Sequence, residues 1–200
     1  MSTPLFLTLL SSYLIGSISG GVIIGKIRKI DIRKMGSKSA GGTNAFRTVG
    51  AIFALMVISI DIFKGYFSTI YVPMIFMQQS TLQVEILAGI FSILGHVYPI
   101  YFDFKGGKGV ATSLGVLLAV FNIKYTLIAL SMWSVTLILS GYVGLSSIIA
   151  GFSVLIINVI DQNEIYYQHV FGLFIALFFI FTHRENIIRM AKGKENQFKK

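Results

Sequence analysis

The sequence predicts an all-helical protein that crosses a membrane several times. Hydrophobic residues make up 54% of the 200 residues and charged residues 12%, whereas soluble domains carry about 25% charged residues. Long apolar stretches recur along the chain, separated by short polar connections. A chain of this length has room for about six or seven membrane-spanning helices and little else. We therefore expect a single integral membrane domain over residues 1–200.

Seven apolar stretches are candidates for transmembrane helices. The predicted spans are residues 3–25, 50–77, 83–102, 109–122, 125–142, 144–160 and 165–183. The first is predicted to be a retained helix, since neither a basic run nor a small-residue cleavage site marks it as a signal peptide. The fourth is short for a full crossing, so five full spans with half-helices are an alternative. Connections of a few residues on either side of the fifth span predict tight helical hairpins.

Basic residues predict the orientation of the chain, because lysine and arginine accumulate in cytoplasmic loops. An external N-terminus and a cytoplasmic C-terminus place 15 of the 17 basic residues inside. These are Lys26, Arg28, Lys29, Arg33, Lys34, Lys38, Arg47, Lys105, Lys108, Arg184, Arg189, Lys192, Lys194, Lys199 and Lys200. Lys64 lies within a span, and Lys124 falls outside with Glu85, Asp161 and Glu164. Cysteine is absent, which excludes disulfides and thiolate chemistry.

A first cluster of glycines and small polar residues, from Met35 to Arg47, follows the first span. Such residues before a helix present free N–H groups to an anion. Arg47 could then form paired hydrogen bonds with phosphate oxygens. A capped, flexible loop explains the same residues equally well. The chain contains no Gly-x4-Gly-Lys-Ser/Thr motif, so this is not a nucleotide-binding Walker loop.

A second cluster, rich in lysine and glycine, precedes the fourth span. It consists of Lys105, Gly106, Gly107, Lys108 and Gly109. Two or three residues would suffice for this connection, so the surplus glycine indicates that the backbone closely approaches another group. Together with the lysines, the glycines predict a phosphate site at the membrane surface. His96, near the end of the preceding span, is predicted to be either functional or a structural histidine that bonds a neighbouring helix.

A third cluster extends from Thr182 to Glu195, at the cytoplasmic end of the last span. His183 and Asn186 are three residues apart and share a face if the helix continues. A histidine can transfer a proton, and an asparagine can orient a substrate hydroxyl or phosphate. A basic amphipathic helix leaving the membrane explains the arginines here but not this pair.

Asp61 and Lys64 lie three residues apart within the second predicted span. Charges at such a depth are costly unless they are paired or near the interface. We therefore predict a structural ion pair that faces the helix bundle.

The three clusters fall on the same predicted side of the membrane and carry enough cations for more than one phosphate. A soluble phosphate ligand alone would not need an apolar protein body. A lipid-linked phosphate would, because its chain can stay in the bilayer while its head reaches the loops. The clusters therefore predict a site for a lipid-linked phosphate.

These motifs resemble those of the bacterial acyl-phosphate:glycerol-3-phosphate acyltransferase family, PlsY. The family carries a Gly-Ser-Gly-Asn-x-Gly-Ala-Thr-Asn-x-x-Arg loop, a Gly-His-x-x-Pro…Phe-Lys-Gly-Gly-Lys-Gly-Val-Ala-Thr loop and a His-Arg-Glu-Asn-Ile-x-Arg segment. The second and third motifs are nearly complete here. The first departs from the pattern at Lys38, Ser39 and Gly42, where the family has glycine, asparagine and alanine.

The resemblance implies transfer of a fatty acyl group from acyl phosphate to the 1-hydroxyl of glycerol 3-phosphate, giving lysophosphatidic acid and phosphate. This is the first acylation of bacterial phospholipid synthesis. The implied location is the cytoplasmic (inner) membrane, with the site facing the cytoplasm and membrane lipid around it. No metal, nucleotide or other cofactor is implied, and nucleic acid is not an expected partner. The oligomeric state is left open, and a monomer is compatible with the sequence.

Carried over residue by residue, the resemblance assigns three groups of site residues. The catalytic group is Ser37, His183 and Asn186. The substrate-binding group is Thr43, Asn44, Arg47, Lys105, Gly106, Gly107, Lys108 and Gly109. The supporting group is Asp61, Lys64, His96, Glu185 and Glu195. The general base is left open between His183 and a substrate phosphate, whose second pKa is about 6.

Two other classes of function are weighed against this one. A transporter for an anionic phosphate metabolite usually has polar groups near the midplane and two related halves, but only Asp61 and Lys64 approach that depth and no repeat is evident. A membrane adaptor with a lipid-binding basic tail is the other. Neither explains the glycines or the pair of His183 and Asn186. The His-x4-Asp signature of thioester-using acyltransferases is absent from the chain.

Overall fold

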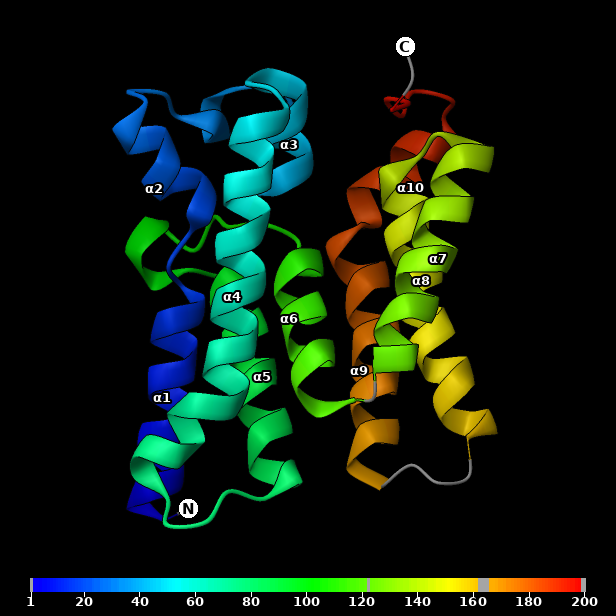
Figure 1. Ribbon diagram of the computed structural model, residues 1–200. Coiled ribbons are helices and arrows are strands. Elements are labelled where there is room, and N and C mark those ends of the chain that lie inside the picture. The colour runs from blue at the N-terminus through cyan, green and yellow to red at the C-terminus, as the bar shows by residue number, and fades with distance from the viewer. Residues whose placement is uncertain (1, 122, 162–165, 199–200) are drawn as a thin grey trace. The chain divides into compact units, whose positions relative to one another are not determined.

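The computed structural model describes residues 2–121, 123–161 and 166–198, and all regular structure within these ranges is helical (Figure 1). The chain divides into two compact units, Met1–Val120 and Phe121–Lys200, and each is described here by itself. The expectation of a single domain stays a prediction.

The first unit is organised around one long helix. Its elements are α1 (Thr3–Gly16), α2 (Gly20–Ile27), η1 (Ile32–Lys34), α3 (Gly42–Thr48), α4 (Ala51–Phe76), α5 (Leu82–Val97), η2 (Ile100–Phe102) and α6 (Val110–Val120). Helix α4 packs against α1, α5 and α6, and α1 also packs against α5. The approach of α4 to α6 needs glycine, because a Cβ on Gly115 would lie 2.1 Å from the carbonyl oxygen of Ile62. Small residues at such crossings let helix backbones come close inside a membrane.

The first predicted span is not one continuous helix, which corrects the expectation for residues 3–25. Helices α1 and α2 meet at an angle of 44° across a three-residue break. Ser19 caps α2, and its side chain accepts a hydrogen bond from the backbone N–H of Val22. Serine and glycine on both sides of the break disfavour a continuous helix. The break gives α2 its own direction toward the first cluster.

The second unit contains three long helices and a short one. They are α7 (Ile123–Ser140), α8 (Val143–Ile160), α9 (Tyr166–Thr182) and α10 (Arg184–Ala191). Helix α8 packs against both α7 and α9. The tight hairpin predicted between the fifth and sixth spans is confirmed, with Gly141 in the left-handed region at φ +73°. The other predicted hairpin, between the fourth and fifth spans, includes residue 122, which lies outside the described residues.

Within the described residues, four helices are long and apolar enough to cross a membrane, or up to six if each bent helix pair counts as one span. Helix α6 has 11 residues, about 17 Å at the usual rise, and is too short for a hydrocarbon core of about 30 Å. This confirms that the fourth predicted span is short. The count of seven and the direction of the chain stay predictions, and Glu164, Lys199 and Lys200 lie outside the described residues.

Candidate functional site

The first cluster is folded against α4 rather than being a flexible loop. A small hydrophobic core joins Ile32 of η1 and Ala45 of α3 to Phe53, Ala54 and Val57 of α4. All five side chains are buried. The short helix α3 is therefore held at the N-terminal end of α4, and the connection after the first span has a defined structure.

Asn44 organises the backbone of the first cluster. Its side-chain oxygen accepts the N–H of Ser37 at 2.9 Å. Its amide nitrogen lies 2.8 Å from the carbonyl oxygens of Ile32 and Ser39 and 3.1 Å from that of Met35. The side chain is 2% exposed, so its hydrogen-bonding capacity is used within the protein. Asn44 thus fixes the backbone at Ser37, which is exposed, and its role in binding substrate stays a prediction.

We expect Asn44→Ala to lower the free energy of unfolding by about 1–3 kcal/mol, because it leaves buried carbonyl groups without a donor. Asn44→Asp is the matched variant, since it keeps the acceptor for Ser37 but loses the donors. Thermal unfolding of both proteins in the same detergent provides the measurement. Equal stability of Asn44→Asp and the unmodified protein would contradict a role for the amide nitrogen.

Thr43 and Arg47 project from α3, four residues apart and therefore on one face. Arg47 is exposed. Lys38, which departs from the family pattern, has φ +59°. A residue with a side chain pays about 1–2 kcal/mol for this left-handed conformation. The glycine in the family pattern would avoid that cost, so the local backbone accommodates the departure under strain.

The second cluster packs tightly onto the C-terminal end of α5. The N–H of Gly106 donates to the carbonyl oxygen of Val97 at 3.2 Å, and the N–H of Gly107 to that of His96 at 3.1 Å. These two N–H groups are therefore occupied, which corrects the expectation that they hold phosphate. Gly109, at φ +86°, leads into α6 at Val110, and the first N–H groups of a helix have no partner within it.

A cation–π contact joins η1, which precedes the first cluster, to η2, which precedes the second. The Arg33 guanidinium lies over the Phe102 ring, 5.6 Å from its centroid, and also binds both carboxylate oxygens of Asp31 at 3.0 and 3.1 Å. This hydrogen-bonded guanidinium holds the pKa of the Asp31 carboxyl below its usual range, although partial burial acts against it. Sequence analysis missed these residues, because nothing in their spacing indicates a contact between two loops.

The predicted ion pair of Asp61 and Lys64 is confirmed, and it forms part of a larger buried cluster. The Lys64 ammonium lies 2.9 Å from Asp61 Oδ1, 2.9 Å from His96 Nδ1 and 2.6 Å from the carbonyl oxygen of Ile18. His96 bonds across from α5 to α4, as the structural alternative predicted. The Ile18 carbonyl was missed, although the Gly16-Ser17-Ile18-Ser19-Gly20 run was a signal that the helix could break there.

In the second unit, His183 lies at the junction of α9 and α10, which bend by 55°. The expectation of a continuing helix is therefore corrected. His183 Nδ1 lies 2.9 Å from the carbonyl oxygen of Phe179. A carbonyl can only accept, so in the neutral ring Nδ1 carries the proton and Nε2 is the accepting nitrogen. This tautomer suits a proton acceptor.

Asn186 is held by the segment that follows α10. Its amide nitrogen donates to Glu195 Oε1 at 2.7 Å, and Arg189 Nε donates to Glu195 Oε2 at 2.6 Å. The Glu195 side chain is 3% exposed, and its supporting role stays a prediction. Glu185 is exposed. Because the third cluster belongs to the second unit, its union with the first two in one site stays a prediction.

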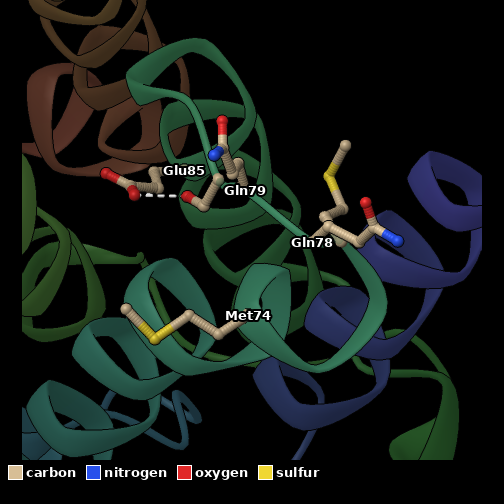
Figure 2. A pocket seen from close by; sticks show the side chains of 6 residues that line it. Met74, Gln78, Gln79 and Glu85 are labelled. Atoms are coloured by element: carbon tan, nitrogen blue, oxygen red, sulfur yellow. Dashed lines mark hydrogen bonds between the residues drawn. The ribbon is translucent and has the colours of Figure 1, made fainter.

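A hollow of about 400 Å³ lies where α4 ends and α5 begins (Figure 2). It is lined by Met74, Met77, Gln78, Gln79, Ser80 and Glu85. The lining has one carboxylate and no cation, so it does not suit a phosphate. Elsewhere in the described residues, no group of three histidine, aspartate or glutamate side chains could hold a metal ion. The prediction of no metal stays a prediction.

Comparison with known proteins bears on the whole chain. A family model described as glycerol-3-phosphate acyltransferase matches residues 6–193. The chain belongs to this family. The glycerol-3-phosphate acyltransferase of Staphylococcus carnosus (strain TM300) is 42% identical, over 96% of this chain and 97% of its own length. That of Staphylococcus aureus (strain Newman) is 39% identical, over 96% of both chains.

Solved structures agree with the family. A crystal structure of PlsY, an integral membrane glycerol 3-phosphate acyltransferase, in its glycerol 3-phosphate form superimposes with a TM-score of 0.87. It is 35% identical and covers 98% of this chain and 96% of that one. The lysophosphatidic acid form gives 0.85 at 34% identity, over 98% and 95% of the two chains. The resemblance stated from the motifs is confirmed, as is the all-helical membrane fold.

Gly107 provides a test of the packing in this glycerol-3-phosphate acyltransferase. A Cβ on Gly107 would lie 2.1 Å from His96 Nε2, so we expect Gly107→Ala to lower the free energy of unfolding by about 1–3 kcal/mol through overpacking. The double variant Gly107→Ala/His96→Ala should recover part of this loss. A double-mutant cycle of unfolding free energies measures the coupling.

Gly106→Ala serves as the matched control for that cycle. Its Cβ would lie 2.0 Å from the backbone carbonyl oxygen of His96, which His96→Ala does not remove. The loss of unfolding free energy caused by Gly106→Ala should therefore persist in Gly106→Ala/His96→Ala. Equal recovery of both alanine variants would contradict a specific contact between Gly107 and the imidazole.

Proposed function

We propose that this membrane protein transfers a fatty acyl group from an acyl phosphate to the 1-hydroxyl of glycerol 3-phosphate, with lysophosphatidic acid and phosphate as products. The hydroxyl oxygen attacks the acyl carbonyl, the carbon–oxygen bond to phosphate breaks, and the hydroxyl proton passes to a base. Membership of the family supports the glycerol 3-phosphate substrate. The observation that carries the proposal is the second cluster, the glycine–lysine loop of residues 105–109, which is seated on the C-terminal end of α5 and leads directly into α6.

The second cluster is assigned to binding a substrate phosphate. Lys108, Gly109 and the first turn of α6 supply the charge and the backbone donors, whereas Gly106 and Gly107 form the packed base of the loop. Both substrates carry phosphate, so their mutual repulsion must be offset before the carbonyl and the hydroxyl can approach. Phosphate is a good leaving group, and positioning with charge neutralisation can supply much of the rate.

The first and third clusters are assigned to binding the acyl acceptor, glycerol 3-phosphate. Arg47 and Lys105 bind the phosphate of glycerol 3-phosphate, and Thr43 lies on the same helix face as Arg47. Ser37, His183 and Asn186 orient the attacking hydroxyl, with His183 Nε2 as the proton acceptor. We place these groups on the cytoplasmic side of the bacterial inner membrane, in keeping with the distribution of lysine and arginine.

The test is to incubate purified protein in lipid vesicles with acyl phosphate and labelled glycerol 3-phosphate. We expect lysophosphatidic acid and phosphate to appear in equal amounts. Acyl-coenzyme A as the donor is the comparison and should give little product. Failure to form lysophosphatidic acid from acyl phosphate, in a sample shown to be folded, would overturn the proposal, and product from the thioester alone would overturn the choice of donor.

A further inference from the structure

The buried Lys64 ammonium forms an ion pair within α4 and hydrogen bonds to two other parts of the first unit. An ammonium carries three protons, and three acceptors surround this one: Asp61 Oδ1, His96 Nδ1 and the Ile18 carbonyl oxygen. Ile18 lies in the break between α1 and α2, where the helix no longer provides a donor for each carbonyl. One side chain therefore holds the break and the His96 ring together.

The contact with Lys64 determines which nitrogen of His96 carries the proton. An ammonium has no lone pair, so Nδ1 must accept from it, and the proton of the neutral ring lies on Nε2. Asp61 Oδ1 is farther from Nδ1, at 3.4 Å, than the Lys64 ammonium at 2.9 Å. The shorter contact therefore favours Lys64 as the partner of Nδ1.

The other edge of the His96 ring faces the glycine–lysine loop. The nearest atom to a Cβ built on Gly107 is Nε2, and the next two are other atoms of the imidazole ring. The backbone carbonyl of His96 also accepts the N–H of Gly107, and that of Val97 accepts the N–H of Gly106. The loop is thus seated on both the backbone carbonyl and the imidazole ring of His96.

We propose that Lys64 is a positioning residue for the glycine–lysine loop: it holds the His96 imidazole with Nδ1 toward itself and Nε2 toward Gly107, against which the loop is seated. The proposal rests on the proposed function in assigning a phosphate to this loop. Lys64 does not touch the phosphate. The same ammonium holds the break before α2, the helix that leads to the first cluster, so it sets both clusters relative to each other.

The experiment compares two neutral replacements of the ion pair. Asp61→Leu/Lys64→Met removes the donor to His96 Nδ1 without leaving a buried charge, and such apolar replacements are often tolerated. Asp61→Asn/Lys64→Met is the rescue variant, because an asparagine amide can donate to Nδ1. Val72→Ala, a buried change elsewhere in α4, controls for general loss of stability.

Amide hydrogen exchange of residues 103–112 is the readout that does not depend on activity. We expect exchange in Asp61→Leu/Lys64→Met to be about tenfold faster than in the unmodified protein, with a smaller change in the rescue variant and none in Val72→Ala. KM for the substrate bound by the loop should rise about tenfold while kcat changes by less than about twofold. If the double variants fold poorly, His96→Asn provides the test instead. It keeps an acceptor for Lys64 but loses Nε2, so it should also speed exchange.

Exchange and KM that stay unchanged in folded Asp61→Leu/Lys64→Met would overturn the positioning role. Effects in the rescue variant and in Val72→Ala as large as those in Asp61→Leu/Lys64→Met would also overturn it, because they would reflect stability alone. If the unmodified protein makes no lysophosphatidic acid, the proposed function fails while the exchange measurement still decides the role of Lys64.

Discussion

Replacing His183 with glutamine is expected to lower kcat for acyl transfer by about 10²–10⁴-fold, the usual contribution of a general base. Glutamine keeps a polar group in this buried position but cannot take up the proton from glycerol 3-phosphate. KM should change little, because the loss is confined to the transition state. Steady-state kinetics with acyl phosphate and glycerol 3-phosphate measure the effect. His169→Gln, the same change in α9 away from the proposed catalytic residues, is the control and should retain activity.

The pH profile identifies the base. With a histidine base, kcat falls as the pH drops and the imidazole becomes protonated, so His183→Gln should abolish this acid limb. If His183→Gln retains most of kcat and the same acid limb, the substrate phosphate is the proton acceptor and the role of His183 is to orient the hydroxyl.

Replacing Lys64 with methionine is expected to lower the free energy of unfolding by about 3–5 kcal/mol, because it leaves the Asp61 carboxylate buried without a counter-charge. Asp61 and Lys64 are 1% and 4% exposed, so water cannot take the place of the missing partner. Thermal unfolding in detergent, followed by the amount of folded protein after heating, is the measurement.

Asp61→Asn/Lys64→Met tests the origin of that loss. Removing the unpaired charge should restore much of the stability, because a neutral amide is far less costly to bury than a carboxylate. Equal instability of the single and double variants would show that Lys64 packing, rather than charge balance, supports the fold.

The spans were predictable to within one or two residues where a single apolar run makes a helix. The second span was expected over 50–77 and is α4, Ala51–Phe76, and the seventh was expected over 165–183 and is α9, Tyr166–Thr182. The third was expected over 83–102 and agrees with the candidate span Leu82–Phe102, in which α5 ends at Val97 because Pro99 follows closely, and η2 completes the span. An apolar run predicts burial in lipid, and local residues such as proline decide where the helix stops.

The site residues were predictable as chemical types but not as partners. Asn44 was recognised as part of the first cluster, yet its amide serves the backbone of that cluster. Gly106 and Gly107 were recognised as markers of close approach, and the group that they approach is His96. A glycine indicates that another group lies close to the backbone, but it does not distinguish a ligand from another part of the protein.

The sequence by itself determined that this is a helical membrane protein of the glycerol-3-phosphate acyltransferase family, because apolar length and ordered motifs are local properties of the chain. Only the tertiary structure decided where the first span breaks and which donors remain for a ligand. Lys64 reaches the Ile18 carbonyl across 46 residues and His96 across 32. Such partners are chosen by the packing of helices, which no local spacing in the sequence specifies.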